Sequence, residues 1–298
     1  MPQEILEWSG VKRIEHDQSP FVWIDGTLGG AGHACSIIPL LREQDQFVGI
    51  DRDPLAVERS EARIESIKPW KCRVRLVHAS YKELPEYIQE GLLEPADGIL
   101  LDLGLSSDQL ADRERGFSFK TGGPLDLRFN PEEGIPAWKY LQIASDEEIA
   151  NAIYRYGEER FSRRIARAIV ERRLEDPVTT AEQLYDLVHR VVPGKIHGRI
   201  DSATRTFQAL RIVVNNELEH LEEAMKWLPK CLKPGGRLVV ITFHSLEDRI
   251  VKHAFRDHPE LEVLTRRPLL PTDQEIEENP RSRSAKLRVA ENCPHPQR

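Results

Sequence analysis

The stretch FVWIDGTLGGAGH, residues 21–33, decides the fold of this 298-residue chain. Residues 21–25 form a short apolar run that ends in an aspartate, and a cluster of glycines follows at once. The next segment, ACSIIPLLRE (34–43), is typical of a helix. Glycines let the backbone turn tightly and approach a ligand closely, and the start of a helix offers unpaired N–H groups. The stretch therefore predicts a strand, a ligand-binding loop and a helix in succession.

The same rhythm continues along the chain. FVGID (47–51), VRLVHAS (74–80) and GILLDLG (98–104) are β-rich runs, and Pro54 suits the first turn of a helix after the first of them. Strands that alternate with helices indicate a parallel sheet with right-handed crossovers. Because the runs are almost continuously apolar, we expect the strands to be buried on both faces. The predicted fold class is α/β, with a doubly wound sheet.

The strand pattern is interrupted after the fourth strand. The segment RYGEERFSRRIARAIVERR (155–173) reads as a helix, and the next strand is RLVVITFH (237–244), after the turn KPGG. We therefore expect a helical domain inserted into a discontinuous sheet domain. The expected boundaries give a sheet domain of residues 1–106 and 206–298 and an inserted domain of residues 107–205.

An apolar stripe at spacings of three and four leads into the fifth strand. Such spacing places the side chains on one face of a helix. We expect a single helix that ends before Pro229 and carries the stripe Phe207, Leu210, Val214, Leu218, Leu221, Met225 and Leu228.

Composition excludes several classes of protein. The chain has 42 Lys and Arg against 49 Asp and Glu, a net charge of −7, so it is not an obvious nucleic-acid binder as a whole. No apolar run approaches the ~18 residues of a membrane helix, and the first residues lack the apolar centre of a signal peptide. We expect a cytoplasmic protein with no membrane partner. The 4 cysteines form no C-x-x-C pair and no histidines have metal-ligand spacing, so we expect no metal site.

The glycine loop has an acidic partner at the end of the second strand. Asp51 lies there, 26 residues after Asp25, where an acid commonly receives the hydroxyls of a ribose. The glycines at positions 26, 29, 30 and 32 do not match the G-x-G-x-x-G pattern of dinucleotide-binding proteins. S-adenosylmethionine tolerates a looser spacing and is the favoured ligand. A nicotinamide dinucleotide and a turn with no ligand remain as alternatives.

Asp102 is a candidate functional residue at the tip of the fourth strand. In an open α/β sheet that tip borders the ligand crevice, and a half-buried carboxylate is costly without a role. The structural alternative is the start of a helix, because Ser106, Ser107 and Asp108 can all cap the next segment. From the residues alone the two interpretations are about equal.

Seven blocks of the sequence resemble the ribosomal small-subunit methyltransferase H family, also called MraW. They are DGTLGGAGH (25–33), VGIDRDP (48–54), DGILLDLGLSSDQL (97–110), ERGFSFKTGGPLDLRFNP (114–131), SATRTFQALRI (202–212), GGRLVVITFHSLEDRIVK (235–252) and NPRSRSAKLR (279–288). The resemblance implies a class I Rossmann-like methyltransferase that uses S-adenosylmethionine, with the inserted domain recognising the substrate. It also implies methylation of N4 of a cytosine in the decoding region of 16S ribosomal RNA.

The resemblance also implies a set of cofactor contacts. Beside the loop glycines Gly29 and Gly30, they are Ala31, Gly32, His33, Asp51, Tyr81, Asp102 and Gln109. The sequence departs from the family pattern at three places. First, the residues before the first strand lack a His-x-Pro-Val-Leu segment; the other two departures are single residues. Ala31 stands where a glycine is common, and Ser202 replaces a usual proline. Tyr81 occupies a position where phenylalanine is more frequent.

Methylation of a cytosine amine needs a hydrogen-bond acceptor, because the N4 lone pair is delocalised into the ring. We expect Asp102 to supply it, with Ser106, Ser107 or Asp126 as further acceptors. Other amino-methyltransferases carry Asp/Asn-Pro-Pro-Tyr after the fourth strand, and only the acid is present here. Two alternatives remain: a DNA amino-methyltransferase, and a non-catalytic RNA-binding factor in ribosome assembly.

Two basic runs predict contact with phosphate groups of the 16S rRNA in the small ribosomal subunit. Segment 155–173 has seven Arg against three Glu, and segment 281–288 has four basic residues and no acid. Phe117 and Phe119 either stack on neighbouring bases or anchor the inserted domain. The oligomeric state stays open, with a homodimer among the alternatives. The expected RNA contacts are Arg163, Arg164, Arg167, Arg281, Arg283, Lys286 and Arg288.

Overall fold

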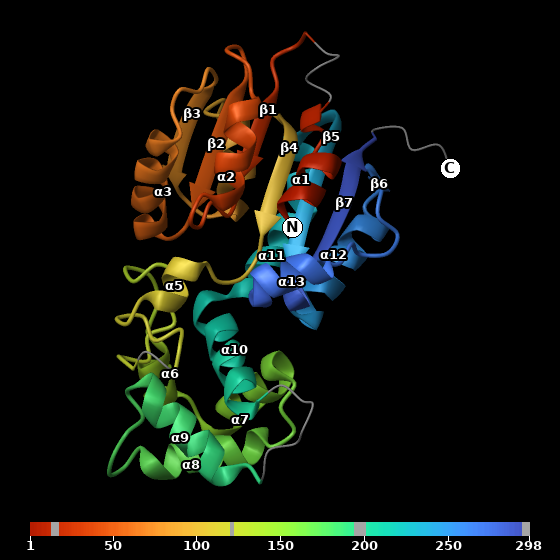
Figure 1. The fold of residues 1–298 in the computed structure, drawn as a ribbon. Helices are drawn as coiled ribbons and strands as arrows, with labels where there is room; N and C mark the ends of the chain where they lie inside the picture. The colour runs from red at the N-terminus through yellow and green to blue at the C-terminus, as the bar shows by residue number, and fades with distance from the viewer. Residues whose placement is uncertain (13–17, 120–121, 194–200, 294–298) are drawn as a thin grey trace. The chain divides into compact units, whose positions relative to one another are not determined.

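The chain forms two compact units, seen here in a computed structural model (Figure 1). The structure describes residues 1–12, 18–119, 122–193 and 201–293. One unit, the sheet unit, contains Met1–Gly104 and Leu218–Arg298; the other, the helical unit, contains Leu105–Glu217. Within the described ranges, no helix combines the length and the apolar character that crossing a lipid bilayer requires.

Seven strands form one sheet in the sheet unit, in the order β3-β2-β1-β4-β5-β7-β6. The first five of these are parallel, and β7 runs antiparallel to both β5 and β6. The chain moves outward from β1 to β3 and then crosses back to β4, so the switch point of the topology lies between β1 and β4. The strands are β1 (Val22–Asp25), β2 (Gln46–Asp51), β3 (Arg73–His78), β4 (Ala96–Asp102), β5 (Leu232–Thr242), β6 (Leu261–Val263) and β7 (Lys286–Asn292).

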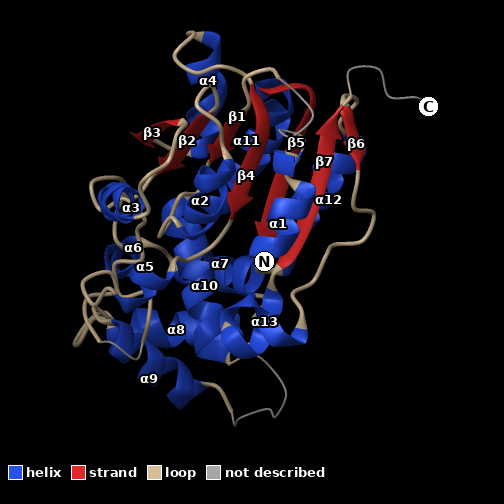
Figure 2. Ribbon diagram, turned by 45° about the horizontal axis from the view of Figure 1, so that its top comes forward, coloured by secondary structure: helices blue, strands red, loops and turns tan. Residues whose placement is uncertain are grey.

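Helices cover both faces of this sheet, which confirms the predicted doubly wound α/β fold (Figure 2). Successive strand residues alternate between two cores: Trp23 and Leu100 pack in one, Ile24 and Leu101 in the other. Because side chains alternate along a strand, each core lies on one face. The first core is closed by α1 (Pro2–Trp8), α2 (Gly32–Ile37) and α3 (Pro54–Ser66), and the second by α4 (Leu84–Gln89), α11 (Glu217–Trp227) and α12 (Ser245–Asp257). A short helix α13 (Asp273–Glu278) precedes β7.

The helical unit has its own apolar core. Phe119 stacks on Tyr185 with ring centroids 4.5 Å apart, and Phe117 stacks on Phe129 at 5.7 Å. Asn215 anchors the long loop before α6, because its side chain accepts a hydrogen bond from the Phe129 N–H at 2.8 Å. The helices are α5 (Ser107–Ala111), α6 (Ala137–Ile143), α7 (Asp146–Gly157), α8 (Ser162–Arg172), α9 (Ala181–Val191) and α10 (Ser202–Asn215).

The prediction of one helix before Pro229 is wrong. The chain breaks at Asn216, which adopts a left-handed φ of 49° between α10 and α11. Asparagine tolerates this conformation better than most residues do, and the break leaves the three-and-four spacing of the apolar residues intact. Phe207 therefore packs in the helical unit, whereas Leu221 packs in the sheet unit. The units divide after Gly104 and Glu217, not after residues 106 and 205.

Candidate active site

Three aspartates lie at the carboxyl edge of the parallel sheet. Asp25 ends β1, Asp51 ends β2 and Asp102 ends β4. Because β1 pairs in parallel with both β2 and β4, the ends of these strands meet at the same edge. This edge, at the switch point between β1 and β4, is where open α/β sheets bind ligands.

The glycine loop after β1 fits closely against this edge. The N–H of Gly26 donates to the carbonyl of Leu100 at 2.9 Å. A Cβ on Gly26 would lie 2.7 Å from a methyl of Leu101 and 3.1 Å from the Cβ of Tyr81, so the position has no room for a side chain. Thr27 then ties the loop to β4, since its hydroxyl accepts the N–H of Asp102 at 2.6 Å.

The loop turns through two residues with left-handed backbone. Gly29 has a φ of 51° and Ala31, which precedes α2, has a φ of 56°. An alanine in this region costs roughly 1–2 kcal/mol, which explains why glycine is the common residue there. From α3, the hydroxyl of Ser60 donates to the carbonyl of Gly29 at 2.8 Å, and Arg63 donates to the carbonyl of Gly30. No sequence pattern singled out these supports.

Asp51 holds the other side of the loop. One carboxylate oxygen accepts the N–H of Gly29 at 2.7 Å and the other accepts the N–H of Asp53 at 2.9 Å. Burial raises the pKa of Asp51 to about 6, against the pull of these backbone hydrogen bonds. Each oxygen of an ionised carboxylate can accept a second hydrogen bond. Asp51 therefore has acceptor capacity left for a diol such as a ribose.

Asp25 lies beneath the loop and is almost completely buried. Its carboxylate accepts the N–H of Thr27 at 3.1 Å. Burial raises the pKa of Asp25 to about 7, and the charge of His33 opposes this rise. The position of Asp25 makes it a support of the loop. Its carboxyl group changes protonation near neutral pH.

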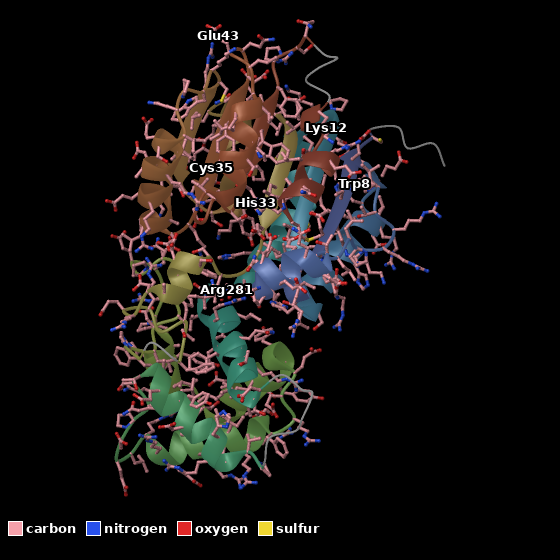
Figure 3. The ribbon with its side chains drawn as sticks, in the orientation of Figure 1. Trp8, Lys12, His33, Cys35, Glu43 and Arg281 are labelled. Atoms are coloured by element: carbon pink, nitrogen blue, oxygen red, sulfur yellow. The ribbon has the colours of Figure 1, made fainter. Side chains whose placement is uncertain are left out.

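His33 and Asp102 form an ion pair at the carboxyl edge of the sheet. The Nε2 atom of His33, labelled in Figure 3, lies 3.2 Å from Oδ2 of Asp102. Burial lowers the pKa of His33, but the hydrogen bond and the charge of Asp102 outweigh it, and the pKa ends above its usual value. The other oxygen, Oδ1 of Asp102, is buried and has no hydrogen-bond partner among the described residues. Such an orphaned acceptor is costly unless a ligand donates to it.

Tyr81 lies beside the loop from the β3 side. It follows β3 in a short 3₁₀ helix, Tyr81–Glu83, which Ser80 begins with a capping box. The tyrosine is partly buried against the core of the sheet unit, and its Cβ faces the place where a Gly26 side chain would point. The sheet unit thus brings together the predicted residues 29–33, Asp51, Tyr81 and Asp102.

The other predicted acceptors belong to the helical unit and already have partners there. Ser106 and Gln109 form the capping box of α5, with side chain to backbone distances of 3.1 and 3.0 Å. Ser107 is exposed in the first turn of the same helix. Asp126 is bound by Arg128 through two hydrogen bonds, at 2.7 and 2.8 Å. Its carboxylate is therefore committed to a neighbouring cation, which the sequence did not indicate.

The predicted RNA contacts divide into exposed and buried residues. Arg163, Arg164 and Arg167 are exposed on α8 and make no ion pair with another described residue. Arg281 and Arg283 are also exposed. Lys286 and Arg288 instead pair with Asp248 of α12, at 3.3 and 2.7 Å.

Arg288 is 6% exposed, so its prediction as a phosphate contact is wrong. Its position inside β7 turns the guanidinium toward Asp248 rather than toward solvent. Phe117 and Phe119 pack in the core of the helical unit, which removes them as base-stacking residues. Among the described residues, no group of three or more His, Cys, Asp or Glu side chains is placed to hold a metal ion.

Comparison with known proteins supports one family over nearly the whole chain. Residues 3–293 match the model of the MraW methylase family. The ribosomal RNA small subunit methyltransferase H of Rhodopirellula baltica is 50% identical, over 97% of this chain and 89% of that protein. The protein of the same name from Thermomicrobium roseum is 46% identical, over 92% of this chain and 88% of the relative.

A solved structure of an rRNA methylase from Streptococcus thermophilus is 10% identical, with a TM-score of 0.43, over 92% of this chain and 87% of that one. The residues that match the family model, 3–293, span both units. The chain belongs to the MraW methylase family.

Proposed function

We propose that this methyltransferase transfers a methyl group from S-adenosylmethionine to N4 of a cytosine in the 16S rRNA of the small ribosomal subunit. Family membership supports the reaction class, and the relatives named above carry the name of a small-subunit rRNA methyltransferase. The observation that carries the choice of an amine is the buried, unpartnered Oδ1 of Asp102 at the carboxyl end of β4. An exocyclic amino group donates the hydrogen bond that this oxygen lacks.

The residues at the sheet edge fit S-adenosylmethionine. Asp51 keeps acceptor capacity for the two ribose hydroxyls, and Tyr81 offers an aromatic face beside the loop for the adenine. The absence of a side chain at Gly26 and the left-handed turn at Gly29 keep the loop backbone close to this edge of the sheet, where the amino-acid end of the cofactor would lie. When bound, the cofactor supplies an electrophilic methyl group on a sulfonium. Every other step depends on the residues of this chain.

Asp102 acts on the amine. Its Oδ1 accepts a hydrogen bond from an N4–H, which makes the nitrogen lone pair more available and fixes the amine for in-line attack. The N4–carbon bond forms as the carbon–sulfur bond breaks, and the surplus N4 proton passes to the carboxylate and on to water. His33 lies 3.2 Å from Oδ2, which leaves Oδ1 as the carboxylate oxygen available to the amine.

RNA binding is assigned to the exposed basic residues. Arg163, Arg164 and Arg167 lie on one side of α8 with no ion-pair partner among the described residues, which leaves their charge available to phosphate. A cytosine that reacts at N4 must be unpaired or extruded, so the target lies in a loop or a splayed strand. Ser106, Ser107, Gln109 and Asp126 stay predictions for contacts to cofactor or substrate from the helical unit.

One experiment tests the substrate and the atom together. Unmodified 16S rRNA, small ribosomal subunits and duplex DNA are each incubated with enzyme and a methyl-labelled donor, and the products are digested to nucleosides for mass spectrometry. We expect label only in N4-methylcytidine from the rRNA samples. Asp102→Asn is the matched control, because it keeps the shape of the site and removes the carboxylate. Label in DNA, label on another atom, or binding of rRNA without any label would each refute the proposal.

A further inference from the structure

Helix α12 presents a stripe of basic side chains on one face. Arg249, Lys252, His253 and Arg256 are all exposed on Ser245–Asp257, and each lies three or four residues from two of the others. Residues at these spacings share a helix face. The opposite face of α12 packs into the sheet unit. We call these four residues the α12 stripe.

The acids nearest to the stripe are already engaged. The carboxylate of Asp248 is bound by Arg288 at 2.7 Å and by Lys286 at 3.3 Å, both from β7. Glu247 is 2% exposed and accepts the backbone N–H of Phe243 at 2.9 Å. Neither acid can therefore neutralise the outer face of the helix.

Arg256 pairs with Asp257 at 2.6 Å, and this is the one ion pair that the stripe makes within the described part of the chain. Among the described residues, Arg249, Lys252 and His253 make no ion pair, although the charge of His253 acts on Asp257. The helix α3, which lies toward the opposite edge of the sheet, differs because its exposed arginines alternate with glutamates. The positive charge on α12 is thus a local feature of one side of the sheet unit.

The stripe begins near the carboxyl edge of the parallel strands. Helix α12 starts with His244 as its cap, directly after the carboxyl end of β5, and Arg249 lies about one turn further on. With a rise of ~1.5 Å per residue, Arg249 and Arg256 are about 10 Å apart along the helix. The Asp248–Lys286 pair also joins the first turns of α12 to the exposed basic segment that contains Arg281 and Arg283. The stripe therefore extends a basic surface that starts at the carboxyl edge of the sheet.

We propose that the α12 stripe binds the phosphate backbone of the RNA substrate, as a contact that the sheet unit makes independently of the arginines on α8. This inference rests on the proposed function, because it takes the substrate to be RNA. Exposed arginine and lysine bind phosphate regardless of base sequence, and Arg249 and Lys252 have no ion-pair partner among the described residues, whereas Arg256 must exchange Asp257 for phosphate. The stripe positions the strand whose base enters the crevice, and it does not select the base.

The test removes the charge of the stripe and compares a matched control. The stripe variant is Arg249→Gln/Lys252→Gln/Arg256→Gln, and the control variant is Arg59→Gln/Lys71→Gln/Arg73→Gln, which removes the same charge near the β3 edge. Binding of unmodified 16S rRNA is measured over a range of salt concentrations. Each phosphate contact to single-stranded nucleic acid contributes about 0.7 to the log–log slope. We expect the stripe variant to reduce the slope by about 2 and the control to leave it near the wild-type value.

Further measurements separate the possible causes of a change. All of these side chains are exposed, so melting temperature and S-adenosylhomocysteine affinity should match the wild type, and Arg249→Lys/Arg256→Lys should keep the wild-type slope. Equal losses in both Gln variants, or an unchanged slope in the stripe variant, would overturn the inference. Normal binding to free rRNA with loss only on intact small subunits would assign the stripe to a protein surface and also overturn it. A wild-type enzyme that neither binds nor methylates rRNA would instead refute the proposed function.

Discussion

Replacing Asp51 by Asn tests whether this carboxylate binds the ribose of the cofactor. In the structure its two oxygens accept the N–H groups of Gly29 and Asp53, at 2.7 and 2.9 Å. Hydrogen bonds to a charged group contribute ~1.5–3 kcal/mol, and a tenfold change in affinity corresponds to about 1.4 kcal/mol. We therefore expect Asp51→Asn to weaken cofactor binding about 10- to 100-fold at neutral pH.

The fold of this variant should survive. Burial raises the pKa of Asp51 from 3.8 to about 6, so ionising it costs the folded protein about 2 pKa units, or ~3 kcal/mol, at neutral pH. This cost is absent at pH values below 3.8, develops as the pH rises from 3.8 to about 6, and is complete above that. The side-chain amide of the Asp51→Asn variant removes this ionisation cost. However, the NH₂ group of that amide faces one of the two backbone N–H donors, which costs ~1–3 kcal/mol. The two effects nearly cancel, and the melting temperature should change little.

The assay is calorimetric titration with S-adenosylhomocysteine between about pH 5 and about pH 8. Wild-type affinity should fall below about pH 6, because the protonated carboxyl loses an acceptor, whereas this part of the pH dependence should vanish in Asp51→Asn. Asp25 and His33 titrate in both proteins, so the difference between the two curves isolates Asp51. Glu58→Gln, an exposed acid on α3, is the control. Equal affinities at neutral pH, or parallel pH curves, would refute the reasoning.

Three further changes test other parts of the site. Asp102→Asn should lower the rate of single-turnover methylation at least tenfold (about 1.4 kcal/mol), since the amide accepts the amine proton poorly, and should lower S-adenosylhomocysteine affinity much less. Equal losses in rate and affinity would make Asp102 a cofactor ligand only. Asp25→Asn should raise the melting temperature clearly more near pH 8 than near pH 5. Burial raises the pKa of Asp25 from 3.8 to about 7, so the cost of ionisation begins to develop above pH 3.8 and reaches its full ~4 kcal/mol only above about pH 7. A shift that is the same at both pH values in a thermal melt would contradict this assignment. Gly26→Val should lower stability in urea by ~1–3 kcal/mol, because a Cβ there lies 2.7 Å from a Leu101 methyl and 3.1 Å from the Tyr81 Cβ; an unchanged midpoint would show that the loop has room.

The sheet and its carboxyl edge were predictable because strands that are buried on both faces have a distinctive, almost continuously apolar sequence. Strands covered on both faces read as apolar runs, and the residue that ends such a run lies at the edge where ligands bind. Asp51 and Asp102 could be placed at that edge for this reason. The ion pair between Asp102 and His33 was not predictable, because it depends on the turn through Ala31 that orients α2.

Charge runs and apolar spacing were less informative than strand ends. The run 281–288 is basic throughout, yet two of its four cations face Asp248, a partner from another element that no local count reveals. The α12 stripe is not evident in the sequence for the opposite reason, because Glu247 and Asp248 in the same segment offset its positive charge in a local count. The break at Asn216 preserves the apolar spacing, so periodicity alone predicted a single helix.

The interrupted order of the strands also affects how the protein is made. β4 ends at Asp102 and its parallel neighbour β5 begins at Leu232, so residues 103–231 are synthesised between two strands that pair directly. At ~5–20 residues per second, the ribosome needs roughly 6–25 s for these 129 residues. During that interval the nascent sheet has an apolar β4 whose outer edge lacks its final partner, which is the type of edge that recruits other chains. We expect slow translation of residues 103–231 to increase the dependence of this protein on chaperones, whereas slow translation after β5 should have little effect.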